Sequence, residues 1–316
     1  MALKIDDKHM QLNNQELKEL CQLACLAATE AGRMISTFSN QQLQIKRKPT
    51  QNTSLGLSGG TSWASQIVTE VDIKSQELII KQLSPSIKKY HFGLLTEESM
   101  DDQSRLEKDY FWCIDPLDGT LPFTEGKDGY SVSIALVSKE GAPIIGVVYD
   151  PAKKNLYHAI KGIEVCKNDN ELYLKHTSKN FTFITDRSFI THHKFKQIKA
   201  GLLKHSQSCG YNTFTHINQG GAAMNALWVL ENSPACYFKL PKSTKGGGSL
   251  WDFAASACIF NELDYPVTDF SGNPLHLNTP NTTFMNKHGI FYGIGINLKD
   301  IHALIPKFNS DKTSHD

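Results

Sequence analysis

The sequence lacks several features that would mark particular classes of protein. No run approaches the roughly 18 consecutive apolar residues of a membrane-spanning helix, and the first residues have no apolar core of a signal peptide. The formal net charge is only +1, without a long basic run, so the electrostatic footprint of a nucleic-acid-binding domain is missing. We therefore expect a cytoplasmic protein that binds neither a membrane nor a nucleic acid polymer.

Cysteine patterns that form cross-links or zinc sites are also missing. The chain has seven cysteines, an odd number, and no CxxC pair, so neither a disulfide framework nor a zinc knuckle is indicated. We expect most of them to be small buried hydrophobic residues, with a catalytic thiol as the minor alternative. They are Cys21, Cys25, Cys113, Cys166, Cys209, Cys236 and Cys258.

What is present is the composition of a globular enzyme, with 40% hydrophobic and 21% charged residues. A chain of 316 residues exceeds the size at which a single core usually stops growing. We expect two halves, an α+β half over 1–155 that is antiparallel in part, and an α/β half over 156–316 in which strands and helices alternate.

Hydrophobic periodicity predicts the main elements. The helices are expected at 14–38, 71–83, 194–203 and 222–231 and from Trp251 onward, and the strands at 91–95, 110–114, 130–137, 143–150 and 181–185. Asn14 is the expected cap of the first helix, and Pro85 is expected to stop the second. The segment 46–65 has no periodicity and is rich in Lys, Ser, Thr and Gly, so we interpret it as a long loop that could act as a lid.

The most informative stretch is DPLDGT, Asp115 to Thr120, directly after a predicted strand. Pro116 fixes the backbone and Gly119 frees it, so both aspartates and the Leu117 carbonyl can turn toward one point. Such hard oxygen ligands suit Mg²⁺. The N–H groups of Gly119 and Thr120 would then face an anion at the start of a helical turn. The alternative is an ordinary turn with an aspartate cap.

Other acidic residues also stand at the ends of predicted elements. Glu97 and Glu98 follow a short strand, Asp72 opens a helix in TEVD, and Asp252 opens another in WDFAA. Taken singly, Asp72 and Asp252 could be helix caps, and the two glutamates a solvated turn. If they converge with the aspartates of DPLDGT, the negative charges require cations or retained protons. Convergence would therefore imply a metal site.

These segments resemble the inositol monophosphatase superfamily of lithium-sensitive, magnesium-dependent phosphatases. The first signature is matched by WCIDPLDGTLPFTEGKDGYSVSIALV and the second by LWDFAASACIFNE, with TEVD and LTEES before them and VTDFSGNPLHLN after them. The resemblance implies a phosphoric monoester hydrolase with the family's layered αβαβα sandwich, in which the second half brings Asp252 to the site. It departs from the family at Leu263, Asp264 and Tyr265, where a glycine pair is common.

The resemblance also implies a role for each site residue. Glu97, Asp115 and the Leu117 carbonyl would hold one Mg²⁺, Asp115, Asp118 and Asp252 a second, and Glu97 with water a weaker third. Thr120 and Asp72 would orient and deprotonate the attacking water, while the N–H groups of Gly119 and Thr120 hold the phosphate. Glu98 would not bind a metal ion itself but would support the residues that do. Family members occur as monomers and as dimers, so the resemblance allows a homodimer.

The second half carries the indications of the substrate, a small phosphorylated metabolite. ITDRSFITHH, containing Ser188, resembles the Ser/Arg loop of the 3′(2′),5′-bisphosphate nucleotidases, although Phe189 stands where a histidine is expected. Lys239, Lys242 and Lys245 lead into GGGS and could attract a second phosphate, or could form a solvated basic loop. The lead hypothesis is the nucleotidase. The alternatives are an inositol monophosphatase, a sugar bisphosphatase, and a regulatory relative that binds metal and phosphate without turnover.

Overall fold

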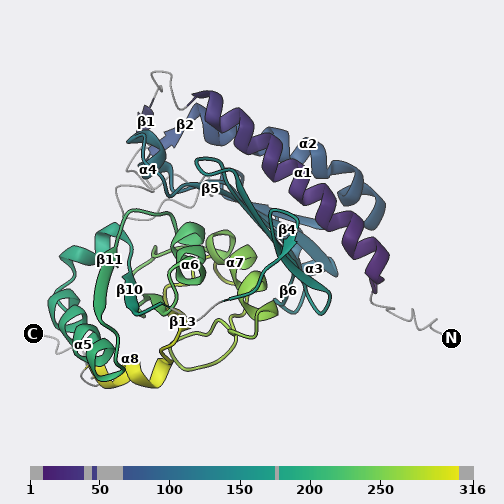
Figure 1. Cartoon of the computed structure of the whole chain (residues 1–316). Helices are drawn as coiled ribbons and strands as arrows, with labels where there is room; N and C mark the ends of the chain where they lie inside the picture. The colour runs from purple at the N-terminus through teal and green to yellow at the C-terminus, as the bar shows by residue number, and fades with distance from the viewer. Residues whose placement is uncertain (1–9, 39–44, 48–66, 175–177, 306–316) are drawn as a thin grey trace, which may run out of the picture.

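The computed structural model describes residues 10–38, 45–47, 67–174 and 178–305. Helices and sheets alternate in five layers, so the predicted αβαβα sandwich is confirmed (Figure 1). Three hydrophobic cores separate the layers: one under the outer helices α1 and α2, one around the central helices, and one under α5 and α8. Each helix or sheet face is thereby buried against the next layer.

The first two layers are a helix pair and a seven-stranded sheet. Helices α1 (Asn14–Phe38) and α2 (Glu70–Tyr90) cover one face of this sheet, as Figure 1 shows in purple and blue. The strand order is β3-β4-β5-β6-β7-β8-β9. The strands are β3 (Gly93–Thr96), β4 (Tyr110–Asp118), β5 (Ser131–Ser138), β6 (Pro143–Asp150), β7 (Asn155–Ile160), β8 (Glu164–Lys167) and β9 (Asn170–Glu171).

The remaining layers come from the second half of the chain. Helices α6 (Ala222–Glu231) and α7 (Leu250–Glu262) lie between the two sheets. The second sheet has the order β11-β10-β12-β13, and the outer layer is formed by two further helices. These elements are β10 (Asn180–Ile184), β11 (Thr213–Ile217), β12 (Ala235–Lys239), β13 (Ile290–Ile294), α5 (Phe195–Ser208) and α8 (Leu298–Leu304).

Short elements connect the layers. Strands β1 (Ile45–Arg47) and β2 (Ile67–Thr69) pair antiparallel, and the short helices are α3 (Ser104–Glu107), α4 (Thr120–Thr124) and the 3-10 turn η2 (Arg187–Thr191). The predicted loop over 46–65 is therefore wrong at its first two residues, which pair with β2. Residues 48–65, and with them the lid hypothesis, lie outside the described residues.

Two predicted helix boundaries are wrong. The first helix is capped by Asn13, not Asn14, because Asn13 Oδ1 accepts from the Glu16 N–H at 3.0 Å while Glu16 Oε2 accepts from the Asn13 N–H at 2.9 Å. Helix α2 continues through Pro85 to Tyr90. The Ser86 hydroxyl, directly after the proline, donates to the Leu83 carbonyl at 2.6 Å.

Other predictions from periodicity are confirmed. The hairpin of β5 and β6 is antiparallel, and α6 has the predicted bounds. The seven-stranded sheet continues beyond residue 155 through β7, β8 and β9, while the division into two halves stays a prediction. After α7, Asp264 takes φ 62° where the family has glycine, a left-handed conformation that aspartate tolerates. Among the helices of the described ranges, none combines the length and apolarity needed to cross a bilayer.

Candidate active site

The candidate site begins where β4 leaves regular pairing with β5. The register between these strands shifts between Asp115 and Asp118, so the chain bulges at the DPLD segment. The Asp115 carboxylate accepts from the Leu117 N–H at 3.1 Å, and the Pro116 carbonyl accepts from the Ser75 hydroxyl at 2.7 Å. These buried contacts fix the bulge and hold both aspartates on one side of it.

Three carboxylates converge at this bulge. Oxygens of Asp115, Asp118 and Asp252 all lie within 4.8 Å of one another. Asp252 arrives in the first turn of α7, where it also forms a capping box with Ser249. The carboxylate of Asp252 therefore both caps α7 and belongs to the acidic cluster, so the two predicted roles of this residue do not exclude each other. Convergence of these three predicted residues, on which the metal hypothesis depends, is observed.

Burial and mutual repulsion disfavour the ionised form of all three acids. Burial is the largest cause of the raised pKa of Asp115, and the charges of Glu97 and Asp118 add to it. Burial and the charge of Asp252 raise the pKa of Asp118 to about 7, and burial raises that of Asp252. Two buried carboxylates and a half-buried one at this separation are stable as anions only beside positive charge. The oxygen-only donor set fits a hard divalent cation.

The other predicted metal ligands border this triplet. Glu97 follows β3, its N–H donates to the Ile114 carbonyl at 3.2 Å, and its charge raises the pKa of Asp115. The Leu117 carbonyl accepts from the Thr120 hydroxyl at 3.3 Å. Among the described residues, Glu97 and Glu98 lie outside the 4.8 Å cluster. The Glu98 N–H donates to Gln76 Oε1 at 3.2 Å, which ties this segment to α2.

The two residues predicted to activate water are neighbours. The Thr120 hydroxyl lies 3.5 Å from Asp72 Oδ1, so the first turn of α2 and the start of α4 meet here. Gly119 between β4 and α4 has φ 84°, and a Cβ there would stand 2.7 Å from the Gly129 carbonyl oxygen. Glycine is therefore required at this turn by both conformation and space. Asp72 is 2% exposed, which favours a role inside the site over a solvated cap.

Helix α6 makes a contact that the sequence analysis missed. The N–H groups of Ala222 and Ala223 donate to Oδ1 and Oδ2 of Asp118 at 2.8 and 2.9 Å. A Cβ on Gly221 would stand 2.4 Å from the same carboxylate. These hydrogen bonds lower the pKa of Asp118 against the effect of burial. The signal was the GG pair before a predicted helix, which marks a helix start that can receive an anion.

A lysine lies beside the acidic cluster, with a partner that the sequence analysis also missed. Lys239 Nζ lies 2.8 Å from Asp186 Oδ2, and its side chain is only 15% exposed. The Tyr237 hydroxyl donates to the other Asp186 oxygen at 2.8 Å. The charge of Lys239 lowers the pKa of both Asp118 and Asp252. The predicted Lys239 is therefore at the site, as a buried, oriented ammonium.

The other predicted substrate residues lie farther out. Lys242 is exposed, but its pKa is lowered by partial burial and by the nearby charge of Lys239. Its Cε would stand 3.0 Å from a Cβ on Gly247, in a glycine run whose three φ angles are all positive. Lys245 and Ser188 are exposed, and among the described residues neither side chain forms a hydrogen bond or ion pair with the carboxylates.

Next to Ser188, an ion pair joins the two halves. The guanidinium of Arg187 in η2 lies 2.5 and 3.0 Å from the two carboxylate oxygens of Glu125, the residue that ends α4. Hydrogen bonds from this guanidinium are the largest cause that lowers the pKa of Glu125, to about 2. The pair therefore places η2 beside the turn that carries Thr120.

Known proteins resemble this chain in sequence and in architecture. The model of the inositol monophosphatase family matches residues 16–303. A Nus factor SuhB from Haemophilus influenzae is 30% identical over 270 residues, covering 84% of this chain and 90% of the relative. A 3′(2′),5′-bisphosphate nucleotidase CysQ from Escherichia coli O157:H7 is 28% identical over 226 residues, or 69% and 82% of the two chains.

A solved inositol monophosphatase from Anabaena has the same fold, with a TM-score of 0.65, 21% identity, and coverage of 92% of this chain and 97% of that one. The family match spans both sheets and every residue of the acidic cluster. Relatives of different activity share it, so the comparisons leave the substrate open. The chain belongs to the inositol monophosphatase family and is a phosphoric monoester hydrolase.

Proposed function

We propose that the chain is a Mg²⁺-dependent, lithium-sensitive 3′(2′),5′-bisphosphate nucleotidase that converts adenosine 3′,5′-bisphosphate into AMP and phosphate. The observation that carries this proposal is the cluster of Asp115, Asp118 and Asp252 with the ammonium of Lys239 beside it. The acidic cluster supports metal-dependent hydrolysis, and the lysine supports a second phosphate. The proposed enzyme is cytoplasmic and acts on a small phosphorylated metabolite.

Asp115, Asp118 and Asp252 would hold two Mg²⁺ ions, together with Glu97 and the Leu117 carbonyl, and a weaker third ion would involve Glu97. When bound, the ions would neutralise the phosphate oxygens, lower the pKa of the attacking water and stabilise the leaving oxygen. The chain's own task is to keep these ligands ionised and in place. The α6 N–H groups and Lys239 do this electrostatically, since both lower the pKa of Asp118.

Thr120 and Asp72 would act on the attacking water. The Thr120 hydroxyl, 3.5 Å from Asp72 Oδ1, is placed to accept the water's proton as it passes its own proton to Asp72. The N–H groups of Gly119 and Thr120 precede the hydrogen-bonded turn of α4 and would hold the phosphate. Glu98 would support the water from the segment that is fixed to Gln76.

A second phosphate would bind between Lys239, Lys242 and the glycine run at 246–248. Lys239 Nζ would stand 3.3 Å from a Cβ on Gly248, and Lys242 Cε 3.0 Å from one on Gly247, so both lysines border this run. Glycine lets a ligand approach the backbone there. Lys245 and Ser188 would contact only the outer part of the substrate.

One observation favours inositol monophosphate as the second candidate substrate. Asp186 already pairs with Lys239 at 2.8 Å and neutralises much of its charge, which suits an uncharged polyol. A sugar bisphosphatase and a binding protein without turnover remain the further alternatives. The intact set of Asp72, Thr120 and the three aspartates argues against the last of these.

The test is a comparison of kcat/KM for adenosine 3′,5′-bisphosphate, 3′-AMP, inositol 1-phosphate and fructose 1,6-bisphosphate. We expect the bisphosphate nucleotide to exceed 3′-AMP by about tenfold or more, since a charge-assisted contact contributes roughly 1.5–3 kcal/mol. Lys239→Met with Asp186→Asn, which leaves no orphan charge, should remove this advantage. Lys196→Met, at an exposed lysine of the outer helix α5, is the control and should keep it. Preference for inositol 1-phosphate in the wild type would contradict the proposed substrate while leaving the hydrolase in place.

A further inference from the structure

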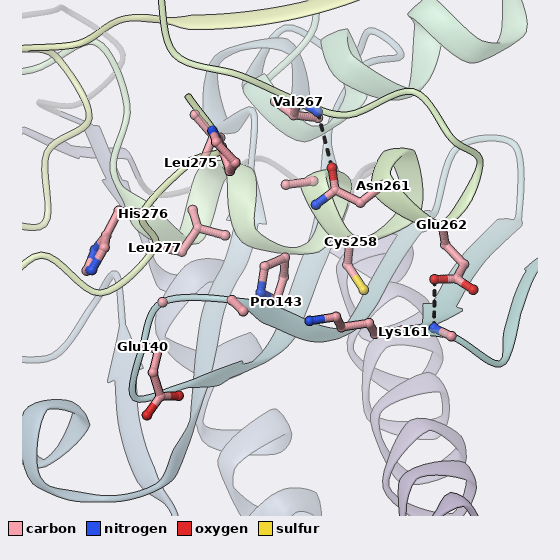
Figure 2. Close-up of a pocket in the computed structure, with 15 residues that line it drawn as sticks. Glu140, Pro143, Lys161, Cys258, Asn261, Glu262, Val267, Leu275, His276 and Leu277 are labelled. Carbon is pink, nitrogen blue, oxygen red and sulfur yellow. Dashed lines mark hydrogen bonds between the residues drawn. The ribbon is translucent and has the colours of Figure 1, made fainter. Parts of the chain in front are cut away.

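The described part of the chain has a large cavity away from the carboxylate cluster. It has a volume of about 610 Å³, within the range of roughly 300–1,000 Å³ that small-molecule pockets occupy. The β5–β6 turn, the end of β7, the last turns of α7 and the segment 274–277 surround it, as Figure 2 shows. None of the proposed catalytic or metal-binding residues lines it.

The floor of this cavity is apolar. Ala257 and Cys258 of α7 line it together with Pro143, Leu275 and Leu277. Ala257, Cys258 and both leucines are buried at 8% exposure or less. A ligand that fills the cavity would therefore cover side chains that are already packed and fixed, so an apolar body gains contact at little ordering cost.

Lys161 brings an ammonium to the cavity, whose lining also includes the carboxylates of Glu140 and Glu262. Within the described ranges its ammonium makes no salt bridge, and Figure 2 shows it extending along the cavity toward Pro143. At the floor, burial and then the charge of Glu262 raise the pKa of Cys258, and the charge of Lys161 lowers it. An exposed lysine above an apolar floor is a fixed place for an acid group.

Two acceptors around the cavity are already used. Glu262 Oε2 accepts from the Gly162 N–H at 2.8 Å, and Asn261 Oδ1 accepts from the Val267 N–H at 3.1 Å. The Asn261 amide nitrogen is thereby left as a donor, and the Glu140 carboxylate points away from Pro143 and Lys161 in Figure 2. Lys161 and the Asn261 amide nitrogen therefore remain as donors for a ligand.

We propose that this cavity binds a small organic anion, an acid group carried on an apolar body. The acid group binds Lys161 and the Asn261 amide, and the body lies on Ala257, Pro143 and Leu275. The site uses the last two turns of α7, the helix whose first turn carries Asp252. It is separate from the hydrolytic site, and its occupation does not depend on the proposed substrate.

The test is binding of 8-anilinonaphthalene-1-sulfonate, an aromatic sulfonate, to the full chain by fluorescence, with octanoate and octanamide as competitors. We expect one sulfonate per chain, displaced by octanoate and not by the uncharged octanamide. Lys161→Met should weaken binding about tenfold, the loss expected for one charge-assisted contact, while Lys161→Arg stays within about threefold. Lys196→Met on α5 is the matched control and should bind as the wild type does.

A second variant tests the place of binding. Ala142 is half-buried on the cavity wall, so Ala142→Trp should fill the space and abolish binding without disturbing the core. Circular dichroism and the melting temperature of each variant establish that it is folded. The proposal would be overturned if the folded wild type fails to bind the sulfonate. It would also be overturned if folded Lys161→Met and Ala142→Trp bind the sulfonate with the affinity of the wild type.

Discussion

The backbone N–H of Ala222 donates to Oδ1 of Asp118 at 2.8 Å. Asp118 ends β4 in the first sheet, and Ala222 begins α6 in the layer between the sheets. The start of a helix carries unpaired N–H groups and partial positive charge, which favour a carboxylate. A proposed metal ligand is therefore oriented by a helix that lies about a hundred residues farther along the chain.

Ala222→Pro should remove this contact while helix α6 still forms. Proline is favoured at the first helical position, and Gly221 already has φ −64° and ψ 173°, a conformation that precedes proline readily. The ring carbon takes the place of the N–H that donates to Asp118 at 2.8 Å, so the hydrogen bond is lost and the carboxylate is displaced. We expect the pKa of Asp118 to rise and kcat/KM with Mg²⁺ to fall about tenfold or more. Steady-state kinetics over a range of Mg²⁺ concentrations measures this.

Ala222→Ser keeps the N–H group and is the control, expected within about twofold of the wild type. A melting temperature close to the wild-type value shows that proline was accommodated. Unchanged kinetics in a folded Ala222→Pro chain would show that the contact has no role in the site.

Asp115→Asn should abolish turnover and stabilise the metal-free chain. Asparagine keeps the shape of the buried side chain and removes one of three converging charges, whose repulsion raises the pKa of Asp115. We expect a loss of activity of about a thousandfold or more and a rise in the free energy of unfolding in EDTA. Phosphate release and urea unfolding measure the two effects. Full activity in the variant would contradict the metal-site assignment.

The pH dependence should follow Asp118. Its pKa rises from 3.8 to about 7 on folding, so ionisation favours the unfolded state, and the metal-free chain should lose stability as the pH rises from about 4 through 7. Mg²⁺ binds the ionised form, so its apparent affinity should fall about tenfold per pH unit below 7. Melting curves in EDTA and Mg²⁺ titrations at pH 5.5 to 8 test both. Asp118→Asn should reduce the slope of the stability profile without removing it, since the raised pKa values of Asp115 and Asp252 contribute as well. An unchanged slope in that variant would assign the whole pH dependence to the other groups.

Lithium should inhibit the Mg²⁺-dependent reaction at millimolar concentrations, as the family resemblance implies. Sodium at the same concentration is the control for ionic strength. A rate of phosphate release that is the same in lithium and in sodium would contradict the lithium sensitivity proposed for this chain.

Much of the fold could be predicted because its elements repeat one pattern over many residues. Helix α1 buries a continuous apolar stripe, and β5 and β6 are apolar runs joined by a short turn. The wrong helix boundaries arise where local packing overrides the helix propensity of single residues. Helix α2 passes through Pro85 because residues on both sides of it, Leu83 and Ser86, are buried against the sheet, and Ser86 also accepts from the Trp112 indole N–H at 3.0 Å.

The site could be predicted only as a set of residue types at element ends. Asp115 and Asp118 share one motif, but no spacing in a sequence shows that Asp252 meets them. The pairing of Lys239 with Asp186 was not predictable either, because it joins the ends of two parallel strands, β10 and β12. The backbone donors of α6 carry no side-chain signature, so only the structure assigns them to Asp118.

The central claim is that the acidic cluster performs metal-dependent hydrolysis of a phosphomonoester, and the most direct measurement is phosphate release with adenosine 3′,5′-bisphosphate. The wild-type chain and Asp115→Asn would be compared in Mg²⁺ and in EDTA. We predict release only by the wild type with Mg²⁺. Equal release by Asp115→Asn, or by the wild type in EDTA, would contradict the account.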